Sequence, residues 1–289
     1  MSRIYLTERD FELLYTLFKA RYMVTPQIRQ LFWHTAGPGS LVACQRRLQR
    51  LTRHGLIRRI EQPVRRGEGS KPYIYALDKA GAEILSREIG IDPTEIDWKP
   101  KPAEENLLFM QHLLHTNDFQ IALTLACQKT RATLVSWTGE TEIRSNEAYD
   151  RVVLAGAKGG SEEVAVIPDG TFVLAYRGRQ PRFCLEIDEG TVSIVPGSRH
   201  SRGWTQKIRA YMEYYESGLY QKRYATDSLR VLTVTKSKAR LAHMKQATEE
   251  AGGDYWFWFT TLEQVTAENV LTGKIWHQAA SDKTYSLLE

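Results

Sequence analysis

Cysteine is scarce in this chain: Cys44, Cys127 and Cys184 are its only three, and they form no Cys-x-x-Cys pair. An odd number of widely spaced cysteines argues against a disulfide framework and a zinc site, and favours a reducing, cytoplasmic setting. No apolar run approaches the roughly 20 residues that cross a bilayer. The opening stretch, MSRIYLTERD, also lacks the apolar region of a signal peptide. We therefore expect a cytoplasmic protein without a membrane partner.

Several catalytic signatures are missing as well. The sequence contains no Walker phosphate loop, dinucleotide fingerprint, G-x-S-x-G or H-E-x-x-H motif, so NTPase, redox and common hydrolase functions have no support. It also lacks the His-x-His metal motif of relaxases, the enzymes that cleave and transfer a DNA strand, so we do not expect the chain to be a relaxase. What is present, 289 residues of which 42% are hydrophobic, suffices for two domains.

Charge is unevenly distributed along the chain. Residues 1–90 contain 16 Lys and Arg against 8 Asp and Glu, a net charge of +8, which leaves −3 for the remainder. A basic amino-terminal part joined to a mildly acidic remainder suggests one module that faces DNA and another with a different task.

The basic part has the element order of a winged helix-turn-helix domain, which we predict over residues 1–90. Apolar residues at helical spacing predict three helices, then two short strands form a hairpin, and a fourth helix closes the domain. In sequence order these elements cover residues 6–21, 24–33, 40–55, 56–64, 71–78 and 78–90.

The third helix and the hairpin tip are the predicted contacts to double-stranded DNA. In winged helices the third helix enters the major groove and the hairpin lies along the backbone or minor groove. Two other interpretations stay open, a merely solvated basic face and a winged helix that binds protein. The candidate DNA-binding residues are Arg46, Arg47, Arg50 and Arg53 on the helix, and Arg65, Arg66 and Lys71 on the hairpin.

Residues 91–106 contain three prolines and no sustained periodicity, which predicts a linker. Residues 107–289 then follow the order helix, strand, strand, strand, helix, strand. This order predicts an α/β domain with a mixed sheet, and it is also the order of the PD-(D/E)xK nuclease fold. The stretch at 146–163 is expected to be irregular.

Acidic residues gather at the strand ends of this domain. Glu186 and Asp188 are two apart in a buried strand, so they share one face, and Asp169 ends the preceding strand region. With Glu140 as a third acid, they are candidate ligands of Mg²⁺ or Mn²⁺, and Asp188 is a further ligand or a base. Lys207 on the next helix is the candidate catalytic residue that stabilises the reacting phosphate through its positive charge. The alternative is a metal-free network in which the acids pair with Lys207 or Arg182.

Taken together, these motifs resemble the replication-relaxation family over roughly residues 6–235. The resemblance implies a DNA-binding protein of plasmids or integrative elements, linked to replication and DNA relaxation, with a restriction-endonuclease-like carboxyl half. The motifs are Y-x-L-x-x-x-G at 75–81, HTNDF at 115–119, W-x-x-E at 137–140, PDG-x-F at 168–172, E-x-D-x-GT at 186–191 and KIRAY at 207–211.

One residue departs from the nuclease pattern, because Asp188 stands where that pattern has a lysine. Two functions therefore remain open: a metal-dependent nuclease or nickase, and a non-catalytic transcription regulator or replication initiator with a degenerate nuclease fold. A homodimer and other replication or mobilisation proteins are further partners that the resemblance allows.

Overall fold

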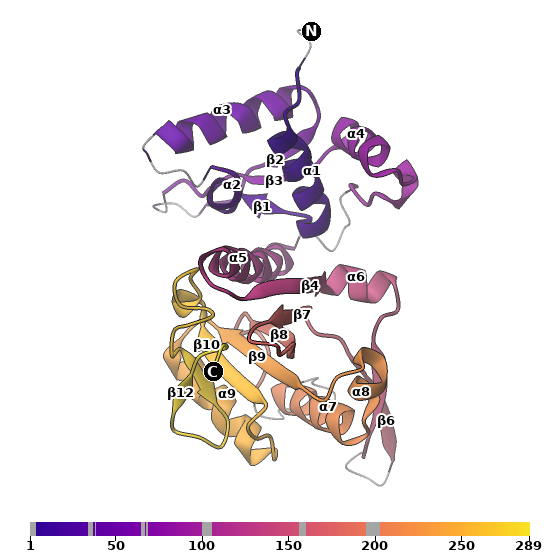
Figure 1. Ribbon diagram of the computed structural model, residues 1–289, viewed down its shortest axis with the longest axis vertical. Coiled ribbons are helices and arrows are strands. Elements are labelled where there is room, and N and C mark those ends of the chain that lie inside the picture. The colour runs from indigo at the N-terminus through magenta and orange to yellow at the C-terminus, as the bar shows by residue number, and fades with distance from the viewer. Residues whose placement is uncertain are drawn as a thin grey trace. The chain divides into compact units, whose positions relative to one another are not determined.

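The computed structural model describes residues 4–33, 37, 39–64, 67, 69–99, 106–155, 160–194 and 203–289 (Figure 1). The chain divides into two compact units, Met1–Ile121 and Ala122–Glu289. The division falls inside helix α5 (Leu107–Lys129). The predicted domain limits, at 1–90, 91–106 and 107–289, stay a prediction.

The first unit contains helices around a small antiparallel sheet, and its predicted helices and hairpin strands are present. The sheet has the order β1-β3-β2, and β1, which pairs with β3, was not predicted. The elements are α1 (Glu8–Ala20), β1 (Met23–Val24), α2 (Thr25–Phe32), α3 (Gly39–Arg53), β2 (Ile57–Ile60), β3 (Ile74–Leu77), α4 (Lys79–Ile89) and a 3₁₀ turn, η1 (Pro93–Glu95).

Polar side chains fix the helices of this unit at their ends. Asp10 accepts hydrogen bonds from the amide and the hydroxyl of Thr7, both at 2.7 Å, and so closes the first turn of α1. The first half of α5 is held by Gln27, which donates to the carbonyl of Leu114 at 2.8 Å and to Asp118 at 2.7 Å.

The second unit is built on a seven-stranded sheet of order β12-β11-β10-β9-β8-β7-β4. Strands β8, β9 and β10 are parallel to one another and the remaining pairs are antiparallel, so the predicted mixed sheet is confirmed. The strands of this sheet are β4 (Thr133–Gly139), β7 (Gly170–Ala175), β8 (Arg182–Asp188), β9 (Leu229–Thr235), β10 (Phe257–Thr261), β11 (Trp276–Gln278) and β12 (Thr284–Tyr285).

Helices α7 and α9 pack on one face of this sheet. Trp204 and Ile208 of α7 and Met244 of α9 share a buried cluster with Cys184 of β8 and Val231 of β9. The helices of this unit after α5 are α6 (Glu140–Ser145), α7 (Trp204–Glu216), α8 (Leu219–Tyr224) and α9 (Lys238–Glu250), with a 3₁₀ turn, η3 (Leu262–Gln264).

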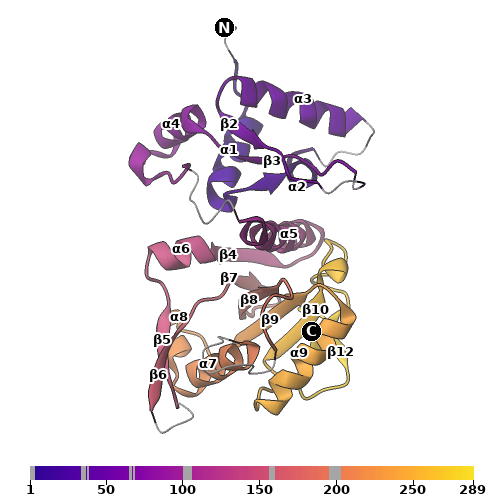
Figure 2. The same ribbon diagram turned by 180° about the vertical axis from the view of Figure 1, so that it is seen from behind.

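The stretch at 146–163, predicted to be irregular, is instead ordered in its described part. Strands β5 (Asp150–Ala155) and β6 (Ser161–Val166) form an antiparallel pair that lies beside α7 (Figure 2). Val152 and Val166 enter the same buried cluster as α7. The prediction was wrong because it followed the glycines of this stretch, which favour an irregular chain, and not the valines on either side of them, which form the two strands.

No helix in the described part of the chain is both long and apolar enough to cross a membrane.

Candidate functional site

The acidic residues of the second unit are brought together by strand register. Gly139 pairs with Gly170 across β4 and β7, which places Glu140 next to Asp169. The amide of Glu140 donates to the carbonyl of Asp169 at 3.0 Å. Gly170 in turn pairs with Leu185, so Asp169 also lies beside Glu186 of β8.

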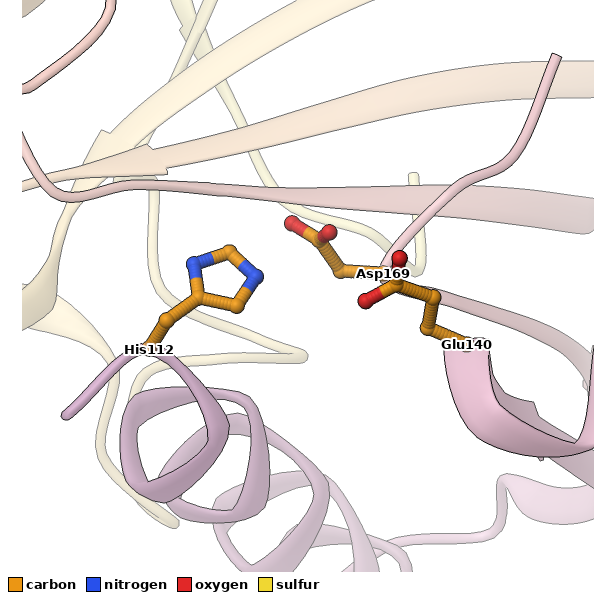
Figure 3. A group of neighbouring side chains, drawn as sticks. All are labelled: His112, Glu140 and Asp169. Carbon is orange, nitrogen blue, oxygen red and sulfur yellow. The ribbon is translucent and has the colours of Figure 1, made fainter. Parts of the chain in front are cut away.

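Glu140 and Asp169 direct their carboxylates toward a common space, and their nearest oxygens lie within 4.8 Å of each other (Figure 3). Both carboxylates belong to the second unit, whereas His112, also drawn there, belongs to the first. Asp169 is 9% exposed, and its Oδ2 accepts from the amide of Ile187 at 2.7 Å. Glu140 also pairs with Arg144, one turn later on α6, at 2.7 Å.

A glycine makes this approach of the strands sterically feasible. The ring of Trp137 lies over Gly170, and a Cβ atom at position 170 would be 2.9 Å from Trp137 Cζ2. Trp137 stacks on Phe172, which stacks on Phe183, with centroid distances of 5.6 and 4.9 Å. The glycine of the PDG motif therefore has a packing role beside the acids.

Glu186 is the most deeply buried acid of the group, at 2% exposed. Two side chains of α7 donate to its carboxylate: the Tyr211 hydroxyl to Oε1 at 2.5 Å and the Lys207 ammonium to Oε2. Because Lys207 and Tyr211 are four residues apart on a helix, they lie on one face and reach the same carboxylate.

Burial sets the electrostatics of this cluster. It raises the pKa of Glu186 to about 7, which the nearby Asp169 reinforces and the Lys207 ammonium opposes. Burial lowers the pKa of Lys207, but the negative charges of Glu186 and Asp169 outweigh it, so the net shift is upward. Lys207 therefore carries its charge at neutral pH.

Asp188 shares a face of β8 with Glu186, as predicted, but its partners are different. Arg240 of α9 binds it in a bidentate ion pair, with both nitrogen–oxygen distances at 2.9 Å, and the Thr235 hydroxyl donates to it at 2.7 Å. Asp188 and Glu186 line one cavity of about 240 Å³ together with Lys207. The metal contact and catalytic role predicted for Asp188 stay predictions.

The donor set of this cluster suits a hard divalent cation. Glu140 and Asp169 supply carboxylate oxygens, the ligands that Mg²⁺ and Mn²⁺ prefer. Glu186 lies beside Asp169, but its two oxygens accept from Lys207 and Tyr211. The Thr233 hydroxyl, on the strand next to Glu186, is buried without a hydrogen-bond partner among the described residues. Lys207 and Arg144 partly offset the charge of these carboxylates, so it is the oxygen donors of Glu140 and Asp169 that fit such an ion.

The arginines of α3 divide into two groups. Arg46, Arg50 and Arg53 are exposed and form no ion pair within the described part of the chain. Arg47 instead donates to both oxygens of Asp10, which is 1% exposed, with its Nε at 2.7 Å.

The DNA contact predicted for Arg47 stays a prediction, although its guanidinium is engaged inside the unit. Of the hairpin residues, Lys71 is exposed, and Arg65 and Arg66 lie outside the described residues.

Sequence reasoning missed Arg240 as a partner of the acids. It lies 52 residues from Asp188, and no local pattern connects the two. Arg182, the other cation considered for the acids, instead lies 4.1 Å from the ring centroid of Tyr224 and donates to the Thr171 hydroxyl.

A family model described as replication-relaxation matches residues 14–229. No curated protein matches the chain.

Two structures of the restriction endonuclease FokI are similar. The DNA-bound one is 12% identical over 92% of this chain and 45% of that chain, and the other is 13% identical over 92% and 44%. The chain thus spans less than half the length of FokI, and the TM-score of 0.29 in both comparisons is too low to carry an argument.

Proposed function

The chain belongs to the replication-relaxation family, and on this premise we propose that it is a DNA-binding protein that acts in the replication or relaxation of a plasmid or another mobile element. Its two units have separate tasks in this proposal. The first binds double-stranded DNA, and the second carries a metal-dependent nuclease or nickase-like centre.

The DNA-binding task rests on the first unit as a winged helix. The order α1, β1, α2, α3, β2, β3 around a three-stranded antiparallel sheet supports this assignment. In that geometry α3 is the helix that enters the major groove. Three of its arginines, Arg46, Arg50 and Arg53, have no ion pair with a described residue and are then available for phosphates and base edges.

The nuclease task rests on one observation: three acids distant in sequence lie beside one another, Glu140 after β4, Asp169 before β7 and Glu186 in β8. Lys207 of α7 pairs with Glu186. The order of helix, three antiparallel strands, helix and parallel strand supports a restriction-endonuclease-like fold for this unit. Bound Mg²⁺ would supply an activated water and a Lewis acid at the phosphodiester.

In this proposal each side chain of the centre has its own role. Glu140, Asp169 and Glu186 hold the cation through their oxygens. Lys207 keeps its positive charge and neutralises the phosphate that reacts. Tyr211, buried beside Glu186, orients that carboxylate through its hydroxyl.

Incubation with supercoiled plasmid and Mg²⁺ or Mn²⁺ tests the centre. We expect the full chain to convert supercoiled to open circular DNA, and Asp169→Asn and Lys207→Met to reduce the rate by at least about 100-fold, since each removes a charge at the reacting group. Asp282→Asn, an exposed acid near the carboxyl terminus, is the matched control and should nick at the wild-type rate. Equal nicking by wild type and Asp169→Asn would mean that a contaminant is responsible.

A specific observation favours a second candidate, a non-catalytic regulator or replication initiator. Glu186 already accepts from Lys207 and Tyr211, and Asp188 is saturated by Arg240 and Thr235. Acids satisfied in this way can hold a fold together without a metal. DNA binding by a wild-type chain that never nicks, with either cation, would support this candidate.

A further inference from the structure

The exposed side of α3 carries more than arginines. Val42, Gln45 and Gln49 recur at intervals of three and four residues, so they lie on one face of the helix together with Arg46 and Arg53. All five are exposed. This face therefore offers apolar, amide and cationic groups side by side.

The same face lines a pocket of about 470 Å³ between α3 and the small sheet. Arg59 of β2 and Tyr73 also line this pocket. The Arg59 guanidinium lies 4.3 Å from the centroid of the Tyr73 ring and forms an exposed ion pair with Glu61 at 3.9 Å. The residues that line this pocket include three arginines and no acid, so its charge suits a polyanion.

The two glutamines are the groups that can read bases. Gln45 and Gln49 are one helical turn apart, about 6 Å along the axis, which is close to the spacing of two base pairs at about 3.4 Å each. A glutamine amide donates and accepts at once, and the major-groove edge of adenine offers the matching N7 acceptor and N6 donor. Neither amide is bonded to another described residue.

Val42 completes the pattern with an apolar group. Its side chain is 45% exposed on a face that is otherwise polar. An exposed β-branched methyl pair next to base-reading amides matches the C5 methyl of thymine, which is the apolar group of the major groove.

We propose that α3 recognises A·T base pairs in the major groove, with Gln45 and Gln49 on adenines and Val42 on a thymine methyl, while Arg46, Arg53 and Arg59 bind the flanking phosphates. This inference rests on the proposed DNA binding of the first unit and adds the base preference of the site. The phosphate contacts contribute affinity for any sequence, and the three uncharged side chains supply the discrimination.

Selection of binding sites from a randomised duplex library by the full chain is the first test. We expect the wild type to enrich a site with at least two A·T pairs. Gln45→Ala and Gln49→Ala should each lose the preference at one position by about 5- to 150-fold, the range for one bidentate contact, with unchanged binding to unselected DNA. Gln246→Ala, an exposed glutamine on α9, is the control and should select the wild-type site.

Modified duplexes assign each contact to an atom. Replacing a selected adenine by 7-deazaadenine removes its N7. We expect this to weaken DNA binding by the wild type, but not by the variant (Gln45→Ala or Gln49→Ala) that lacks the glutamine assigned to that adenine. Replacing the selected thymine by uracil removes the C5 methyl, which should weaken DNA binding by the wild type but not by Val42→Ala. Arg53→Ala should instead weaken binding to every sequence alike and reduce the salt slope by about 0.9.

The possible outcomes separate the inference from the function on which it depends. A wild-type chain that binds no duplex, even at low salt, would overturn both. Selection of G·C pairs, or a site unchanged by all three substitutions, would overturn A·T recognition and leave DNA binding in place.

Discussion

At the scale of single residues, Glu186 should make stability depend on pH. Its pKa in the folded chain is raised from 4.5 to about 7 by burial, so between these values the folded state binds more protons than the unfolded state. The contribution of this carboxyl to the free energy of unfolding therefore decreases as pH rises from about 4.5 to 7. Urea unfolding at pH 5 and pH 8 measures this change. We expect the Glu186→Gln variant to lack the decrease in the free energy of unfolding that this carboxyl causes between the two pH values.

Glu249 provides a control of opposite sign. Burial alone would raise its pKa, but Lys245 and the Ala280 amide lower it below the ordinary value. The contribution of Glu249 to the free energy of unfolding is therefore lost as pH falls. The free energies of unfolding of Glu249→Gln and the wild type should thus differ most at the higher pH. Parallel pH curves for the wild type and Glu186→Gln would contradict the raised pKa.

Arg47 and Arg50 are neighbours in the arginine row of α3, but we expect different effects from their removal. Arg47→Ala leaves the buried Asp10 carboxylate without its cation, which should cost about 2 kcal/mol of unfolding free energy. Arg50→Ala removes an exposed side chain that has no ion pair with a described residue, and should stay within about 0.5 kcal/mol of the wild type. Chemical denaturation of both variants tests this, and equal stabilities would rule out a structural role for Arg47.

At the scale of elements, the packing of β4 against β7 supports the acidic centre. Gly170→Ala places a methyl group 2.9 Å from Trp137 Cζ2, so the ring or the strand must shift, at a cost of about 1–3 kcal/mol. The register partner Gly139 has room, since its added Cβ would find its nearest neighbour at 3.8 Å. Gly139→Ala should therefore be clearly less destabilising in thermal unfolding, and the reverse order would contradict this account.

The sequence predicted elements best where one local pattern was sufficient. The apolar spacing of α1, α2 and α3 identified these helices. The strands around Asp169 did not follow from the sequence pattern, because the chain leaves β6 at Val166 and begins β7 at Gly170, so that Asp169 lies between two strands. Arg240 could not be predicted, because tertiary packing alone brings α9 to Asp188.

At the scale of the whole molecule, the basic charge of residues 1–90 should make DNA binding strongly dependent on salt. With about six phosphates neutralised, affinity should fall by about 1,000-fold between 50 and 200 mM salt, because counterions are released on binding. Fluorescence anisotropy with a labelled duplex measures this slope. Affinity that does not change with salt would argue against the basic face of α3 as the DNA surface.

The closeness of Trp137 to Gly170 has an evolutionary consequence. The indole occupies the volume that any side chain at position 170 would need, so the two positions are not free to vary independently. In homologues where a smaller residue replaces the tryptophan, we expect alanine or serine to occur in place of the glycine. The two positions should therefore covary across an alignment of the family.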